Sequence, residues 1–452
     1  MDTSRPVLPE DLISQIFSYL EADVLDLASL KEQVLRKTTF INACLACKSL
    51  YRIVRPIYYR TSDLSCGREH DSARLNGPFN VLLRRRDTAS LVLRLRMPIS
   101  SRGRGEDCTF IPPNASDSEA IKSLRRVAET ARLRKSTPLA LLESIKGLRA
   151  GAVCGAILFA CVNLQVLHLR TKGSHETLPT ALLDLVGRVR SESFQKLNEL
   201  VIEHKPDPHL LALHEIPHVL ALPKLRTFRG YQVAFSHRSG ANPLCSMGQV
   251  AVEQIELYNS WIHRVGMESL LRMCPRLKHL TIIWDLDGIR HFSRRLDIAG
   301  DLLRQHAASL KSLTLGIDDV ASAYLDKIMA LSLGSLRNLD ALSSLTISKR
   351  LLTGGIPDER WPDHVPFNEL LPFSLQELHV SEELDFELDY MVRCLESLMS
   401  GDRYRDLRVI SIRGIERPWF WPRLSMVQPE ASAIGWSACW IDEDESEFRK
   451  VA

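Results

Sequence analysis

The stretch LKSLTL, from Leu310 to Leu315, decides the fold, because its spacing of aliphatic residues returns along most of this 452-residue chain. Seven further copies match L-x-x-L-x-L with an aliphatic residue at each apolar position. They begin at Leu164, Leu197, Val252, Leu277, Leu342, Leu375 and Leu407. A degraded copy, LRTFRG, begins at Leu225, and Leu93 with Leu95 indicates an earlier one. From Leu164 onwards the copies lie roughly 25 to 33 residues apart, a spacing typical of repeat proteins.

Each copy predicts a short β-strand, because its last apolar positions alternate with other residues. Helical patterns lie between the copies, for example over Met267–Cys274, Ala299–Ser309 and Leu388–Met399. A strand and its return helix form one turn, which hides its apolar side only against neighbouring turns. The chain is therefore predicted to be α/β, with a parallel sheet and outer helices. The alternative is an unrelated α/β domain.

The N-terminal stretch RPVLPEDLISQIFSYL, Arg5 to Leu20, predicts a short amphipathic helix. Pro9 suits the first helical position, and the acidic residues after it are favoured by the helix dipole. Three helical turns are too few to stand alone in water, so this helix must pack on neighbours. Two more helices are predicted, over Asp23–Leu35 and Thr38–Val54, and Pro56 is expected to end the last one. Its buried stripe would contain Phe40, Ile41, Cys44, Leu45, Tyr51 and Val54.

Two segments, LPEDLISQIFSYL and INACLACKSLYRIVRPIYYR, resemble the F-box of fungal F-box proteins. The resemblance implies a three-helix F-box over residues 1–60. It implies that the Leu-Pro corner and the first helix dock a Skp-family adaptor, which links the chain to a cullin-type ubiquitin ligase. The adaptor-binding candidates carried over are Leu8, Pro9, Leu12, Ile16, Phe17 and Leu20. The alternative is a helical cap in which some of these residues pack inward on Ile41 and Leu45.

Residues 61–425 resemble the leucine-rich repeats of F-box proteins. The resemblance implies a solenoid, a horseshoe with a parallel β-sheet and outer helices. One departure predicts irregular turns: the Asn or Cys usually found eight residues after the start of a copy is missing. Those positions hold Lys172, Lys205, Ser260, Asp285, Asp318, Arg350, Glu383 and Ile415.

In a horseshoe, the residues between the apolar positions of each strand point to the concave face. The two rows they form bring Arg229, Tyr231, Glu256 and Tyr258 together in the middle of the array. Tyr and Arg are enriched at binding hot spots, so a target protein is predicted to bind there. A solvated sheet face without a ligand is an equally good interpretation.

Composition and the remaining segments narrow the classes of function. A formal charge of +3 is too near neutral to indicate nucleic-acid binding, even with an Arg-rich, flexible segment at 97–136. There is no signal-peptide pattern and no run of eighteen apolar residues, which predicts a cytoplasmic or nuclear protein away from membranes. Residues 426–452 are expected to form a Trp-containing C-terminal cap and an acidic tail.

Catalytic and metal-binding motifs are weak. HEIPH, His214 to His218, has the letters of a zinc-protease helix, but Pro217 would break the turn that must align its two histidines. Cys44 and Cys47 form a single C-x-x-C and are interpreted as core thiols. No enzyme activity, metal or cofactor is expected. The chain is predicted to be the substrate-recognition subunit of a cullin-type ubiquitin ligase, and the alternative is a leucine-rich-repeat scaffold with no ligase role.

Overall fold

The computed structural model describes the segments that carry the helices and strands. They are residues 9–22, 30–64, 81–82, 85–100, 157–158, 160–172, 194–204, 211–212, 220–235, 250–262, 264–285, 296–306, 308–317, 332–353, 367–381, 394–399, 402–413, 436–442 and 445–450. The chain divides into two compact units, Met1–Val201 and Ile202–Ala452, and each is described by itself.

The first unit begins with three helices, α1 (Glu10–Ala22), α2 (Leu30–Ala46) and α3 (Lys48–Arg60). The sequence placed the break between the second and third helices too early. The break falls at Cys47, whose extended backbone and Sγ, 3.4 Å from the amide N of Leu50, cap α3. Pro56 lies inside α3 and does not end it. Proline removes one helical hydrogen bond, and the burial of Val54 and Ile57 on either side of it favours the continued helix.

The helices lead directly into a parallel sheet. β1 (Thr61–Asp63) follows α3 without a gap and pairs with β2 (Arg94–Ser100), which pairs with β3 (Val166–Lys172). The short helix α5 (Arg86–Ala89) precedes β2. The early repeat copy starts at Val92, one residue before the predicted Leu93, because Val92, Leu95 and Met97 are the buried residues.

The second unit continues the pattern with one strand for each copy. In order across the sheet lie β6 (Thr227–Tyr231), β8 (Gln254–Ile262), β9 (His279–Trp284), β10 (Ser312–Ile317), β11 (Ser344–Ser348), β12 (Glu377–Ser381) and β13 (Val409–Arg413), all parallel. Every one of these strands, like β3 and β4 (Glu199–His204), begins two residues after the first aliphatic residue of its copy. The predicted strands and the parallel α/β sheet are confirmed.

The strands alternate as the spacing requires. In β9, Leu280 and Ile282 are buried whereas Thr281 between them is half-buried. Thr281 pairs in register with Thr314 of β10, which pairs with Thr346 of β11, so equivalent residues form rows across the sheet. The half-buried rows define what we call the polar face of the sheet.

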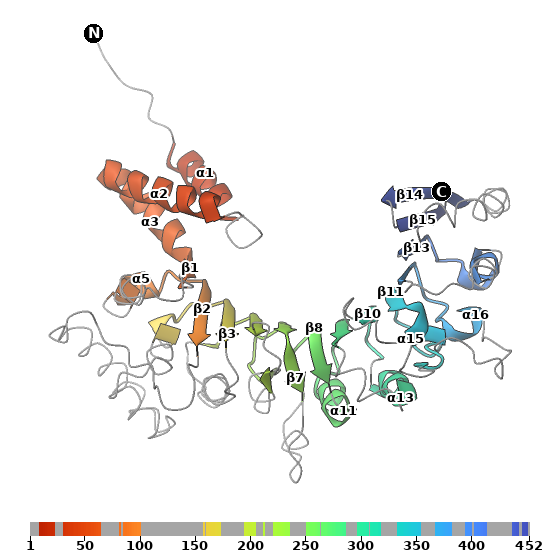
Figure 1. The fold of residues 1–452 in the computed structure, drawn as a ribbon. Helices are drawn as coiled ribbons and strands as arrows, with labels where there is room; N and C mark the ends of the chain where they lie inside the picture. Colours follow the sequence, from red (N-terminus) through yellow and green to blue (C-terminus); the bar gives the residue numbers. More distant parts are fainter. Residues whose placement is uncertain are drawn as a thin grey trace. The chain divides into compact units, whose positions relative to one another are not determined.

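The helices of the second unit follow some of the strands. α11 (Arg264–Met273) and α13 (Leu296–His306) pack on one another and lie along the same side of β8 to β10 (Figure 1). They confirm two of the predicted helical stretches, and residues 394–399 are helical within the third. The shorter α15 (Lys349–Thr353), α16 (Phe367–Leu370) and the 3-10 turn η4 (Asp402–Tyr404) lie near the later strands.

A backbone ladder joins neighbouring turns where the chain enters each strand. The carbonyl oxygen of Lys278 accepts from the N–H groups of Lys311 and Ser312, at 2.8 and 2.9 Å. That of Glu253 accepts from Lys278 and His279, at 2.8 and 3.0 Å. The pattern continues at the carbonyls of Lys311, Ser343 and Gln376. These bonds tie the turns together at the strand entries, whereas the positions that lack the usual asparagine lie at or near the opposite ends of the strands.

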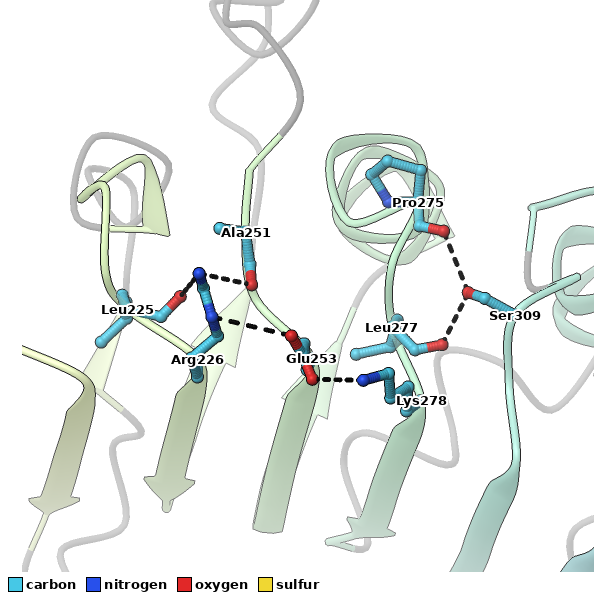
Figure 2. A network of polar contacts seen from close by, with 8 residues as sticks. All are labelled: Leu225, Arg226, Ala251, Glu253, Pro275, Leu277, Lys278 and Ser309. Carbon is cyan, nitrogen blue, oxygen red and sulfur yellow. Dashed lines mark hydrogen bonds and ion pairs between the residues drawn. The ribbon is translucent and has the colours of Figure 1, made fainter.

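Side chains reinforce the ladder at some turns. The Ser309 hydroxyl donates to the carbonyl oxygens of Pro275 and Leu277, at 2.9 and 2.8 Å (Figure 2). Ser374 makes the same pair of contacts with Leu339 and Leu342. A small hydroxyl before the first leucine therefore fastens one turn to the previous one.

A bulge interrupts the regular strands in the middle of the array. Gln232 and Asn259 have positive φ, 56° and 48°, directly after Tyr231 and Tyr258. Beyond it, β7 (Val233–Phe235) and the end of β8 form a second small parallel sheet with β5 (Leu211–Ala212). The Ser260 hydroxyl accepts from the Val233 N–H at 3.3 Å and donates to the Tyr258 carbonyl at 2.7 Å. Ser260 stands at one of the positions where the usual repeat has asparagine, and its hydroxyl thus supplies polar contacts between turns.

An antiparallel hairpin follows the last repeat strand. β15 (Glu445–Lys450) pairs with β13, and β14 (Trp436–Asp442) pairs with β15. Trp436 is buried, whereas the other three C-terminal tryptophans, Trp419, Trp421 and Trp440, have no described side chain. Part of the expected acidic tail is in β15, because Glu445 and Glu447 pair with residues of both neighbouring strands.

Candidate functional site

The outer face of α1 exposes large apolar side chains. Leu12 is 42% exposed and Ile16 is 47% exposed, and Pro9 before them is also exposed. Leu8 lies outside the described residues, and Leu20 is described only as part of the α1 backbone. A helix normally turns such residues toward the core, so this face has apolar area beyond what α1 needs to pack.

The inner face of α1 packs through Phe17. Its ring centroid lies 5.2 Å from that of Phe40, which forms the core of the helical module with Val54 and Ile57. Phe17 therefore keeps only part of its surface for a partner. In the alternative interpretation some of the adaptor-binding candidates pack inward on Ile41 and Leu45, but both of those side chains are exposed and Phe17 packs on Phe40.

Part of the predicted buried stripe faces solvent. Leu45 is 78% exposed, and Ile41 and Tyr51 are exposed as well. Within α2, Phe40 and Cys44 take the packed side, and Ile41 and Leu45 lie about 100° further round the helix. The break at Cys47 starts α3 with a new rotation, so the period of α2 does not continue to Tyr51. The module has more exposed apolar surface than the sequence predicted.

The third helix is fastened to the start of the sheet. Arg55 forms an ion pair with Asp87 and donates to the Thr88 hydroxyl at 2.7 Å. The hydrogen bond from Arg55 is the main cause that holds the pKa of Asp87 below its usual value. The Leu93 N–H donates to the carbonyl of Arg60 at 2.8 Å. Within the first unit, the helical module is thus attached to β1 and β2 through α3.

The four predicted target-binding residues do come together on the polar face of the second unit. Tyr231 and Tyr258 pair in register, and their rings stack with centroids 4.9 Å apart and planes 14° apart. Arg229 and Glu256 also pair in register, and Nε of Arg229 lies 3.2 Å from Oε2 of Glu256. We call these residues the tyrosine cluster.

Glu256 is the centre of the cluster. It accepts from the Tyr258 hydroxyl at 3.2 Å and from the Gln254 side-chain amide, besides its ion pair with Arg229. Burial, together with the charge and hydrogen bond of Glu256, raises the pKa of Tyr258 to about 12. Gln254 was not predicted. Its place two residues before Glu256, on the same side of the strand, is the signal that could have identified it.

This arrangement supports binding and offers no obvious chemistry. The carboxylate of Glu256 is engaged by three neighbours, and the two stacked, half-buried rings of Tyr231 and Tyr258 add aromatic groups to the polar face. Beside it, the polar face continues through Thr281, Thr314 and Thr346. Such a surface can contact a partner chain through aromatic and hydroxyl groups.

The structure describes only some of the residues considered as weak catalytic or metal-binding motifs. HEIPH lies outside the described residues. Cys161 and Cys274 are buried thiols whose pKa burial raises to about 12. Cys47 is exposed at the α3 cap, so the interpretation of Cys44 and Cys47 as two core thiols is wrong for Cys47. In the part of the chain that the structure describes, no three His, Cys, Asp or Glu side chains are placed to hold a metal ion.

No protein-family model and no curated protein matches this chain. Of the helices that the structure describes, none is both long enough and apolar enough to cross a membrane.

Proposed function

We propose that the chain is the substrate-recognition subunit of a cullin-type ubiquitin ligase. The first three helices would be an F-box, and the parallel sheet with its helices a leucine-rich-repeat solenoid. The F-box would dock a Skp-family adaptor, and through it a cullin, while the repeats hold a target protein. The protein would work in the cytoplasm or nucleus.

One observation carries the proposal: Leu12 and Ile16 are exposed on the face that the F-box resemblance assigns to the adaptor. A module that served only as a cap would bury such residues. Covering a leucine or isoleucine side chain on association removes apolar surface from water and favours binding by about 1 to 2 kcal/mol each. Phe17 would support this surface from beneath, because it packs on Phe40.

The proposed mechanism is proximity. Holding the target beside a ubiquitin-charged enzyme converts an encounter in solution into a reaction within one complex. The chain then needs two separate binding surfaces and no catalytic group of its own. The tyrosine cluster is the best candidate for the target side, because aromatic and arginine side chains are enriched at hot spots.

The second candidate is a repeat scaffold in which the helical module serves only as a cap. The direct passage from α3 into β1, and the contacts of Arg55 with Asp87 and Thr88, favour it. The two roles use different helices, since α3 holds the sheet and α1 carries the exposed face. Adaptor binding therefore decides between them.

The test is a pull-down of the tagged full chain with a purified Skp-family adaptor. The parent should bind, and the double variant Leu12→Asp with Ile16→Asp should lose binding while keeping its circular dichroism spectrum. Leu45→Asp is the matched control, because it places the same charge on an exposed leucine of α2.

A folded parent that does not bind would reject the ligase role and leave the scaffold. Loss of binding in Leu45→Asp with retention in the double variant would move the docking face to α2 and reject the carried-over residues.

A further inference from the structure

A second surface of the second unit lies at the edge where the chain enters the strands. Five cations occupy the segments that lead into β6, β9 and β10, and we call them the entry strip. They are Lys224, Arg226, Arg276, Lys278 and Lys311. Lys278 is half-exposed and the other four are exposed. No motif in the sequence marks them, because they fall in three different repeats.

The backbone ladder brings these segments side by side. The Arg226 carbonyl bonds to the N–H of Glu253, the Glu253 carbonyl to that of Lys278, and the Lys278 carbonyl to that of Lys311, each at 2.8 Å. Neighbouring strands lie about 4.8 Å apart, so the strip spans roughly 14 Å from β6 to β10. An extended peptide of about four residues covers that length.

One carboxylate holds the centre of the strip. Glu253 lies 2.6 Å from Nζ of Lys278 and 3.6 Å from Nε of Arg226, and Arg226 also donates to the carbonyl of Ala251 at 3.1 Å (Figure 2). The Lys278 hydrogen bond, with the charges of Lys278, Arg226 and Arg276, lowers the pKa of Glu253. Glu253 therefore fixes two cations in position and stays ionised.

The positive charge is concentrated at this place. Five cations and one carboxylate leave a formal charge of +4 on the strip, whereas the whole chain carries +3. The strip ends at β11, where the equivalent of Lys278 and Lys311 is Ser343 and the exposed Asp340 lies nearby. A local excess of this kind raises the concentration of anionic partners near the edge.

We propose that the entry strip binds a carboxylate-rich segment of a partner protein, in an extended conformation across β6 to β10. Ordered cations that are fixed before binding lose little side-chain freedom when an acidic segment arrives. Nucleic acid is the less favoured ligand, because the described entry segments of β6 to β10 hold no aromatic side chain for base stacking. This inference does not depend on adaptor docking.

The test is fluorescence anisotropy of the full chain with a labelled peptide of six glutamates flanked by glycines, at about 50 mM and 150 mM salt. We expect saturable binding that weakens with salt, since exposed charges are screened over about 8 to 10 Å. The variant Lys278→Gln with Lys311→Gln should bind about tenfold more weakly. Arg408→Gln is the matched control, because Arg408 enters β13 at the same position of its repeat and lies outside the strip.

Four results would overturn the proposal. The first is no binding by the folded parent at the lower salt concentration. The second is equal binding of a six-glutamine peptide, and the third is equal weakening by Arg408→Gln, since either would mean that the strip is not the site. The fourth is displacement of the peptide by single-stranded RNA at lower concentrations than by unlabelled peptide, which would identify a nucleic-acid surface.

Discussion

Replacing Gly300 with alanine is expected to destabilise the second unit, although helix propensity alone predicts the opposite sign. Gly300 lies inside α13, where alanine is favoured over glycine by roughly 0.5 to 1 kcal/mol. A Cβ at this position would lie 1.8 Å from the carbonyl oxygen of Leu333. Real Cβ contacts stay beyond 3.0 Å, so helix and loop would have to separate by about 1.2 Å.

The loop cannot move away without losing bonds on its other side. The Leu333 N–H donates to the Leu351 carbonyl at 2.9 Å, and the Leu336 N–H donates to the Leu370 carbonyl at 2.7 Å. Each such hydrogen bond contributes about 1 kcal/mol, and overpacking costs about 1 to 3 kcal/mol. With both hydrogen bonds lost and the propensity gain subtracted, Gly300→Ala should destabilise by about 2 to 4 kcal/mol.

The assay is thermal unfolding of the full chain followed by circular dichroism. For a unit of this size the expected loss lowers the midpoint by about 4 to 16 °C. Gln305→Ala is the control, since it places an alanine at an exposed position of the same helix and should leave the midpoint nearly unchanged. A Gly300→Ala variant as stable as the parent, or more stable, would refute the close approach of α13 to Leu333.

Three further predictions concern single side chains. The hydroxyl of Tyr258, with its pKa raised to about 12, should ionise two pH units above free tyrosine in ultraviolet titration, and Glu256→Gln should lower that pKa. Its contribution to stability is therefore complete below pH 10 and is lost as the pH rises through 12. Alkylation of the native chain, mapped by mass spectrometry, should label Cys47 well before buried Cys274, and equal rates would contradict the described burial. The single change Leu12→Asp should alter the free energy of unfolding by less than about 1 kcal/mol, because the side chain is exposed; a large loss in thermal unfolding would mean that it packs in the core.

The strands were predictable because a single rule governs them. The aliphatic positions of each copy must face the core in every turn, so the spacing gives both the position of the strand and the row of each half-buried residue. This is why Arg229, Glu256, Tyr231 and Tyr258 could be placed together before the structure was known. The leucine pattern did not predict a further buried position, three residues before several of the copies, where Cys161, Cys274 and Leu339 lie.

The remaining features depend on interactions that the repeat pattern does not encode. The bulge after Tyr231 follows from a positive φ at Gln232, a residue type that gives little warning of it. The break at Cys47 depends on a sulfur that caps α3 in place of the usual oxygen. The entry strip arises from the spatial order of turns, because its cations are distant in sequence.

The backbone ladder at the strand entries has a consequence for how such a protein can change over time. Its bonds run from main-chain N–H to main-chain carbonyl, so the side chain at each rung is not needed to form it. Arg226, Glu253, Lys278, Lys311 and Ser343 occupy equivalent rungs with quite different charges. Mutations there can rewrite the charge pattern of the edge with little penalty in folding. Natural selection could therefore retarget this edge to new partners while the repeat architecture stays the same.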